Sequence, residues 1–111
     1  MYQERKNLKI QTKAYSNFRV KLKLENDGSD FESFQIWNFS EDGSNLFTDL
    51  DSIPYEIGDR LLGTLFERQD GVLMKFSATV VWKEGTNMGI KFHEELVLPD
   101  TFHAIQMSII D

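Results

Sequence analysis

The most constraining feature of this sequence is the strict alternation of apolar and basic residues from Phe18 to Leu24. Apolar side chains occupy positions 18, 20, 22 and 24, and basic ones occupy positions 19, 21 and 23. Successive side chains of a β-strand point to opposite faces, so this period of two predicts a strand with one buried face. Such half-buried strands are typical of antiparallel sheets. We expect Lys21 and Lys23 to form a solvated basic face rather than a ligand site.

Five further apolar-rich segments predict strands, and turn residues separate them. The expected strands cover residues 31–39, 44–48, 61–68, 72–83 and 88–92. The sequence Gln69-Asp70-Gly71 is a tight-turn signal that favours a hairpin between the fourth and fifth of the six strands.

Two of these segments carry specific expectations about which side chains are buried. In 31–39, Phe34 and Ile36 fall on one face, with Trp37 and Phe39 on the other. A strand that is apolar on both faces is usually covered on both. In 72–83, the period of two places Trp82 in the core.

The end of the chain changes period. Its apolar residues recur at steps of four, three and four, at Leu98, Phe102, Ile105 and Ile109. This spacing predicts an amphipathic helix over about 99–110, with Pro99 suited to its first turn. Six strands followed by one helix predict an all-β fold with a C-terminal helix, a small six-stranded antiparallel β-barrel. We expect one domain over residues 10–111 and a flexible basic arm over residues 1–9.

Composition narrows the function. With 41% hydrophobic residues in 111, the chain has enough apolar side chains for one folded core. The absence of cysteine excludes disulfides and thiolate metal sites. His93 and His103 lie too far apart for a typical metal-ligand spacing. We therefore expect no metal and no cofactor. No nucleophile stands beside a base in a known motif, so an enzyme is not expected.

Charge and hydropathy limit the partners. The net charge of −6 disfavours nucleic acid, and it is unevenly spread: residues 1–24 carry +6 and residues 25–111 carry −12. The sequence has no evident secretory signal and no apolar run of membrane-spanning length. We expect a cytoplasmic protein that does not insert into membranes.

The segment Asn38-Phe39-Ser40-Glu41-Asp42-Gly43 is the strongest candidate for a site. Asn and Ser form turns because their side chains bond nearby backbone groups, and Gly43 can adopt a positive φ without strain. A plain hairpin turn is therefore the simplest interpretation of this segment alone. Two other features bear on the function. One is a basic Arg5-Lys6-Asn7-Leu8-Lys9 stretch near the N-terminus, and the other is a Gly89-Ile90-Lys91-Phe92 strand late in the chain.

Taken together, these features resemble the PilZ family of bacterial cyclic di-GMP receptors. That family carries Arg-x-x-x-Arg near its N-terminus and Asp/Asn-x-Ser-x-x-Gly after its second strand. Here the second motif is complete as Asn38, Ser40 and Gly43, whereas the first has lysine in its second place, as Arg5 and Lys9. The resemblance covers nearly the whole chain. It implies a PilZ-like barrel that binds cyclic di-GMP without catalysing a reaction.

The resemblance also implies roles for individual residues. The basic arm would wrap over the barrel and close the nucleotide against the Asn38–Gly43 corner. A guanidinium can pair with a phosphate or a guanine edge and can stack on a purine, whereas a lysine supplies only a point charge. The implied cyclic di-GMP ligands are Arg5, Lys6, Lys9, Asn38, Ser40 and Gly43.

The expected output is a change in arm position that an unidentified effector protein reads. One alternative is a ligand-blind PilZ-like adaptor with a degenerate nucleotide site, because Lys9 replaces the second arginine. Another is a small barrel that binds single-stranded nucleic acid, but this would need a basic groove, which the charge of residues 25–111 disfavours.

Overall fold

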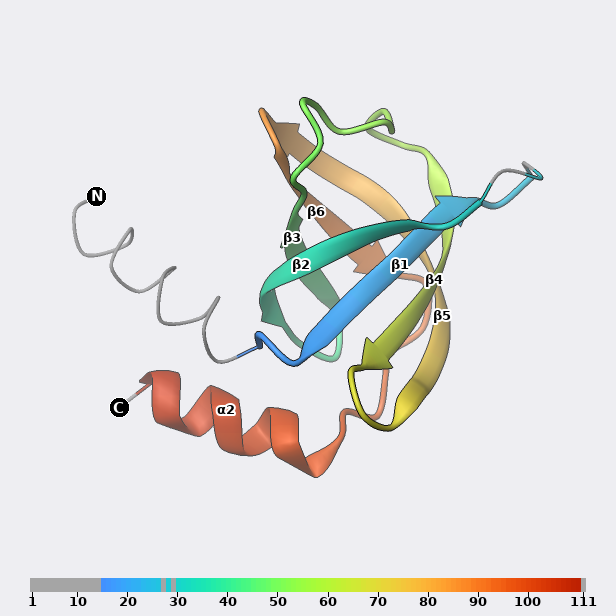
Figure 1. Cartoon of the computed structure of the whole chain (residues 1–111). Helices are drawn as coiled ribbons and strands as arrows, with labels where there is room; N and C mark the ends of the chain where they lie inside the picture. The colour runs from blue at the N-terminus through green and yellow to red at the C-terminus, as the bar shows by residue number, and fades with distance from the viewer. Residues whose placement is uncertain (1–14, 27, 29, 111) are drawn as a thin grey trace.

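Six antiparallel strands form a closed barrel, and one helix lies across an open end of it (Figure 1). The computed structural model describes residues 15–26, 28 and 30–110, with side chains described up to residue 105. The elements are β1 Phe18–Leu24, β2 Glu32–Phe39, β3 Gly43–Phe47, β4 Arg60–Glu67, β5 Gly71–Glu84, β6 Asn87–Phe92 and α2 Asp100–Ile110. The predicted six-stranded β-barrel with a C-terminal helix is confirmed, and most strand ends differ from the expected ones by one residue.

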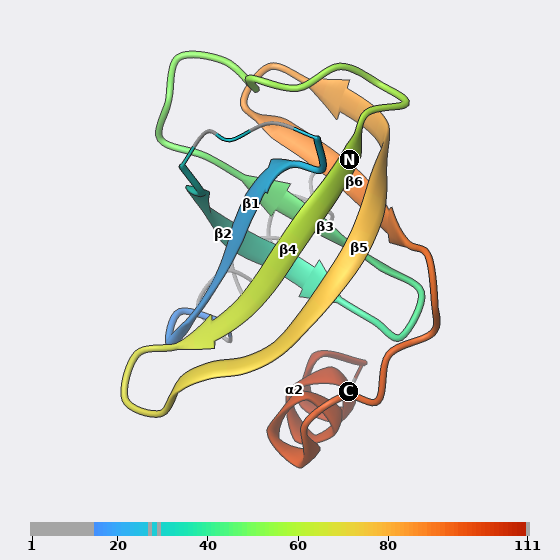
Figure 2. The same cartoon turned by 90° about the vertical axis from the view of Figure 1, so that its right-hand side faces the viewer.

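The strands follow each other around the barrel in the order β1-β2-β3-β6-β5-β4, and β4 pairs with β1 to close it. Closure leaves no free edge for another chain to pair with. Figure 2 shows β1, β4 and β5 side by side on the near face of the barrel. β4 lies in the middle of this near face, so the outer surface of β2, β3 and β6 lies on the opposite side of the barrel.

The barrel interior is filled by the apolar side chains that the period of two predicts for β1. Val20 and Leu22 are fully buried, and Lys21 and Lys23 lie on the outer face. At the open end, the Phe102 ring of α2 is fully buried and makes edge-on contacts with Tyr15, Phe18 and Phe39, with ring centroids 4.7–5.2 Å apart. Because aromatic burial contributes strongly to a core, Phe102 anchors the helix to the barrel.

Two β-bulges overturn the expected faces of the second and fifth strands. In β2, the register with β3 shifts between Ile36 and Asn38, so Phe39 joins Phe34 and Ile36 inside the barrel. In β5, the register with β6 shifts between Val80 and Trp82. The prediction that Trp82 lies in the core is wrong, since the side chain is 38% exposed on the outer face. A bulge inserts one residue and so reverses the alternation beyond it.

Candidate functional site

The candidate site is the hairpin that joins β2 to β3. The Ser40 backbone N–H donates to the Gly43 carbonyl at 2.9 Å and closes the turn. The Ser40 hydroxyl stays inside this turn, where it accepts from the Asp42 and Gly43 N–H groups at 3.3 Å and donates to the Gly43 carbonyl at 3.2 Å. These bonds are the ones a hairpin interpretation of the motif predicts. Ser40 is nevertheless exposed, so its oxygen is within reach of a ligand.

Asn38 is held at the end of β2 by its neighbours on β3. Its side-chain Oδ1 accepts from the Asn45 N–H at 3.2 Å, and its backbone carbonyl accepts from the Ser44 hydroxyl at 2.6 Å. The Oδ1 contact fixes the orientation of the amide and leaves the side-chain NH2 as a donor for a base edge or a phosphate. The bulge in β2 is what turns Asn38 to the outer face.

Gly43 is required by close packing and not by an unusual backbone angle. Among the described residues, positive φ angles occur at Gly58, Gly71 and Gly85, so the expected use of positive φ at Gly43 is not seen. A Cβ at position 43 would instead collide with the Ile90 carbonyl on β6. The missing side chain lets β3 approach β6 and keeps the floor of the site open.

These residues line one shallow depression on the outer face, with a volume of about 480 Å³. That size falls within the usual range for small-molecule sites. Its walls include an exposed cation, Lys91, directly opposite Gly43, and one carboxylate, Asp42. The lining residues are Asn38, Ser40, Asp42, Gly43, Ser44, Asn45, Ile90 and Lys91. Amide, hydroxyl and ammonium groups together suit an anionic ligand with polar base edges.

Trp82 is a site neighbour that the sequence analysis placed in the core. It pairs with Gly89, which pairs with Asn45, which pairs with Asn38, so all four stand in one cross-strand row. The indole lies against the face of Gly89, where a Cβ would overlap it. The indole therefore lies on the outer face over β6, next to the strand that carries Asn45, although Trp82 is not among the residues that line the depression. An exposed aromatic ring there can stack on a purine.

The sequence did contain a signal for this placement. The turn Gly85-Thr86 is two residues long, and a two-residue hairpin fixes the register of the strands that flank it. Counting outward from Glu84 and Asn87 pairs Trp82 with Gly89. In β-sheets an aromatic side chain often packs over a glycine on the neighbouring strand, where there is no side chain to block it. This pairing therefore predicts that the Trp82 indole lies over Gly89.

The site hairpin is also tied to the segment that leads into α2. The Asp42 carbonyl accepts from the Phe92 N–H at 2.8 Å, and the Glu41 carbonyl accepts from the Leu96 N–H at 2.9 Å. The hairpin and the residues 93–99 that follow β6 are therefore mechanically connected. One of these bonds reaches the segment directly at Leu96, and the other holds the hairpin to Phe92, the last residue of β6.

Of the six predicted ligand residues, the structure brings Asn38, Ser40 and Gly43 together. Arg5, Lys6 and Lys9, with the whole predicted arm, lie outside the described residues. Within the described part of the chain, no cluster of three or more His, Asp or Glu side chains could hold a metal ion. No helix in that part is long and apolar enough to cross a membrane.

The comparison with known families covers almost the entire chain. A family model described as "PilZ domain" matches residues 3–104. The matched range contains both the basic segment at Arg5 to Lys9 and the hairpin that ends at Gly43. No curated protein matches the chain.

Proposed function

This chain belongs to the PilZ domain family, and we propose that it is a receptor for cyclic di-GMP that signals to a partner protein without catalysing a reaction. PilZ domains are generally binding domains. The observation that carries the proposal is the convergence of Asn38, Ser40 and Gly43 on one depression that also holds Lys91, with Trp82 in the same cross-strand row as Asn38. These are the groups that a dianionic ligand with two guanine bases requires.

Each part of the site has a distinct task in this proposal. Lys91 and the basic arm neutralise the two phosphates, with Arg5 as the one group able to form a bidentate contact. The Asn38 NH2 and the Ser40 hydroxyl bond to base edges or phosphate oxygens. The Trp82 indole stacks on a guanine, and such stacking contributes about 1–3 kcal/mol per base.

The arm closes over the nucleotide in this account and thereby becomes readable by an effector. Its basic residues are attracted to the acidic body, which carries −12 over residues 25–111, and the bound phosphates add two further negative charges at the site. The hydrogen bonds that the Phe92 and Leu96 N–H groups donate to the Asp42 and Glu41 carbonyls give a second route, from the hairpin to the end of β6 and the segment before α2. Both routes convert nucleotide binding into a change of surface without chemistry.

Trp82 supplies a direct test. In the Trp37→Phe variant, Trp82 is the remaining tryptophan, and its emission is followed while cyclic di-GMP is added. We expect saturable quenching with cyclic di-GMP and none with GTP or cyclic GMP at equal concentration. Further replacement of Ser40 by alanine should weaken the quenching. Quenching that is identical for all three nucleotides would refute a specific site.

A second candidate function is favoured by one residue. Lys9 stands where the family motif has its second arginine, and lysine can neither form a planar fork nor stack as arginine does. In this alternative the chain is a ligand-blind adaptor that keeps the barrel for protein contacts. The Lys9→Arg variant separates the two. Binding that appears only in Lys9→Arg would assign the wild type to the adaptor function.

A further inference from the structure

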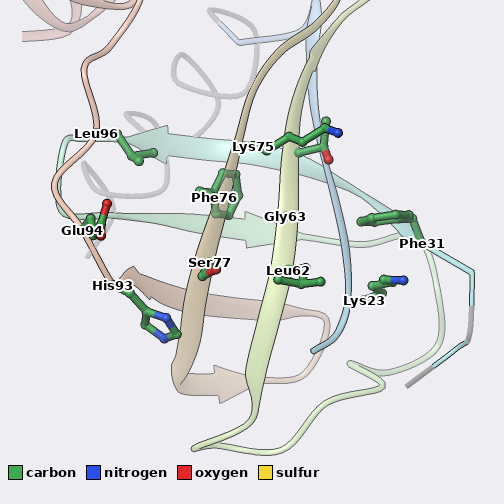
Figure 3. Close-up of a pocket in the computed structure, with 11 residues that line it drawn as sticks. Lys23, Phe31, Leu62, Gly63, Lys75, Phe76, Ser77, His93, Glu94 and Leu96 are labelled. Atoms are coloured by element: carbon green, nitrogen blue, oxygen red, sulfur yellow. The ribbon is translucent and has the colours of Figure 1, made fainter. Parts of the chain in front are cut away.

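A second surface, distinct from the nucleotide site, combines cations with a groove. It lies on the outer face of β1, β4 and β5, and the groove has a volume of about 720 Å³. Lys23 and Phe31 form one flank, and residues of the segment after β6 form the other (Figure 3). The lining residues are Lys23, Phe31, Leu62, Gly63, Thr64, Lys75, Phe76, Ser77, His93, Glu94 and Leu96. We name this surface the β1-β4-β5 groove.

The cross-strand register explains the shape and the charge. Lys21 pairs with Thr64, which pairs with Lys75, and in the next row Lys23 pairs with Leu62, which pairs with Ser77. The short Thr64 and Ser77 side chains keep the floor low between taller flanks. The cations therefore stand along the rim of a partly apolar floor.

Two cations of this face, Lys21 and Lys23, lie over aromatic rings and are not neutralised by them. The Lys23 ammonium lies 5.3 Å from the centroid of the Phe31 ring, and the Lys21 ammonium lies 4.6 Å from that of Phe66. In the described part of the chain, Lys23 and Lys75 take part in neither of the ion pairs, which join Arg60 to Glu25 and Lys83 to Glu56. A cation over an aromatic ring keeps its charge available to an incoming anion.

We propose that the β1-β4-β5 groove docks an acidic segment of a partner protein, with an apolar side chain of that segment seated on Leu62. Charge complementarity selects the occupant. Two cations, Lys23 and Lys75, line the groove against one carboxylate, Glu94, and Lys21 on β1 lies beside the lining residue Thr64. Phe31 is 45% exposed and adds apolar surface to one flank of the groove. Interfaces of this kind combine an apolar centre with a charged rim.

Other occupants fit the molecule less well. The closed barrel has no free strand edge, so the partner is recognised by side chains and not by strand addition. An extended polyanion or an anionic membrane would also meet the acidic remainder of the chain, which carries −12 over residues 25–111. A short acidic segment avoids that repulsion. The basic N-terminal segment of this chain is repelled by the same cations.

The groove is connected to the nucleotide site through one of its flanks. Leu96, which lines the groove, donates its N–H to the Glu41 carbonyl of the site hairpin at 2.9 Å. A partner in the groove therefore touches the segment that the hairpin holds. The docking proposal itself stands without the nucleotide, because the groove is present in the free chain.

The test measures binding of a fluorescein-labelled peptide of Glu and Leu by anisotropy, together with amide chemical shifts of the full chain. Gln/Leu and Glu/Ser peptides probe the charge and the apolar side chain separately. Lys75→Glu reverses an exposed cation in the groove, and Arg68→Glu makes the same charge change at an exposed cation outside it. Thermal melting checks that both variants remain folded.

We expect the Glu/Leu peptide to bind more tightly than either control peptide and to shift the amides of Lys23, Leu62 and Lys75. Lys75→Glu should weaken this binding about fivefold and Arg68→Glu by less than about twofold. Cyclic di-GMP binding should be equal in both variants, so a failed nucleotide site would not imitate this result.

Several results would overturn the docking proposal. Equal loss of binding in Lys75→Glu and Arg68→Glu would show attraction by net charge alone, and shifts confined to other strands would place the peptide elsewhere. A wild-type dimer that becomes monomeric in Lys75→Glu would assign the face to a second copy. Preferential binding of oligo-dT or phosphatidylglycerol vesicles at this face would assign it to a nucleic acid or a membrane.

Discussion

Two glycines face aromatic rings across neighbouring strands, and replacing each by alanine should have very different effects. A Cβ at Gly63 would overlap the Phe76 ring and lie 2.9 Å from Leu22 Cδ2, inside the barrel. A Cβ at Gly89 would overlap the Trp82 indole, on the outside. The local collision is similar, so the difference depends on whether the ring can leave.

The Phe76 ring has little room to move, although Phe76 also lines the β1-β4-β5 groove. It is 7% exposed and packs edge-on against Phe39 and Phe92, with ring centroids 6.4 and 4.8 Å away. Relief of the collision must therefore displace the ring from its contacts with Phe39 and Phe92 or separate β4 from β5. Overpacking of a tight core typically lowers the free energy of unfolding by about 1–3 kcal/mol. Because Phe39 and Phe92 confine the Phe76 ring, we expect Gly63→Ala to lower it by about 3 kcal/mol. At about 4 °C per kcal/mol for a domain of this size, the melting temperature should fall by about 12 °C.

The Trp82 indole can rotate into solvent. Gly89→Ala then loses one cross-strand contact, worth about 0.2–1 kcal/mol, and gains a similar amount from replacing glycine within a strand. The melting temperature should change by less than about 4 °C. Tryptophan emission should shift to longer wavelength, because Trp82 becomes more exposed.

Thermal denaturation followed by circular dichroism measures both variants, and Trp82→Phe in the Gly89→Ala background serves as the control. If the account is right, Gly89→Ala causes no emission shift once Trp82 is absent. Equal destabilisation by Gly63→Ala and Gly89→Ala would refute the reasoning, because it would show that Trp82 is held as rigidly as a core ring.

Three further predictions concern the site and one buried tyrosine. Ser40→Ala and Asn38→Ala should each weaken cyclic di-GMP binding by about 1–3 kcal/mol in calorimetry, and unfolding by either change in a thermal melt would show that the residue is structural only. Lys9→Arg should tighten cyclic di-GMP binding by about 1 kcal/mol, whereas Lys9→Ala should mainly lower the salt sensitivity of binding. The dissociation constants of the wild type and both variants are measured at two salt concentrations, and values that agree among the three proteins at both concentrations would remove Lys9 from the site. Burial and the nearby Glu32 carboxylate raise the pKa of Tyr55, whose hydroxyl donates to the Leu22 carbonyl at 3.0 Å, to about 12. Its contribution to stability is therefore complete below pH 10 and is lost as the pH rises towards 12, so tyrosinate absorbance should show a late-titrating group that Tyr55→Phe removes.

Much of the barrel could be predicted because the alternation of residue types is a direct consequence of strand geometry. In β1, every second side chain from Phe18 to Leu22 is buried as expected. The two bulges could not be predicted from alternation alone, since an inserted residue leaves the composition of a strand unchanged. They decide the site, because they turn Asn38 and Trp82 outward.

The candidate site was predictable only in part. The Ser40 turn follows from local hydrogen-bonding preferences, so the motif itself identified it. Lys91 reaches the site through pairing of β3 with β6, in which Lys91 lies opposite Gly43, 48 positions earlier in the sequence. The close approach of Gly43 to Ile90 has the same origin. Such long-range contacts depend on how the barrel closes.

The central claim is that the hairpin at Asn38–Gly43 and the basic arm form one cyclic di-GMP site. Isothermal titration calorimetry of the full chain with cyclic di-GMP tests it most directly, with GTP and cyclic GMP as controls and Arg5→Ala as the matched variant. The account predicts saturable heat with cyclic di-GMP alone and its loss in Arg5→Ala. Absence of binding in the wild type, or unchanged affinity in Arg5→Ala, would contradict it.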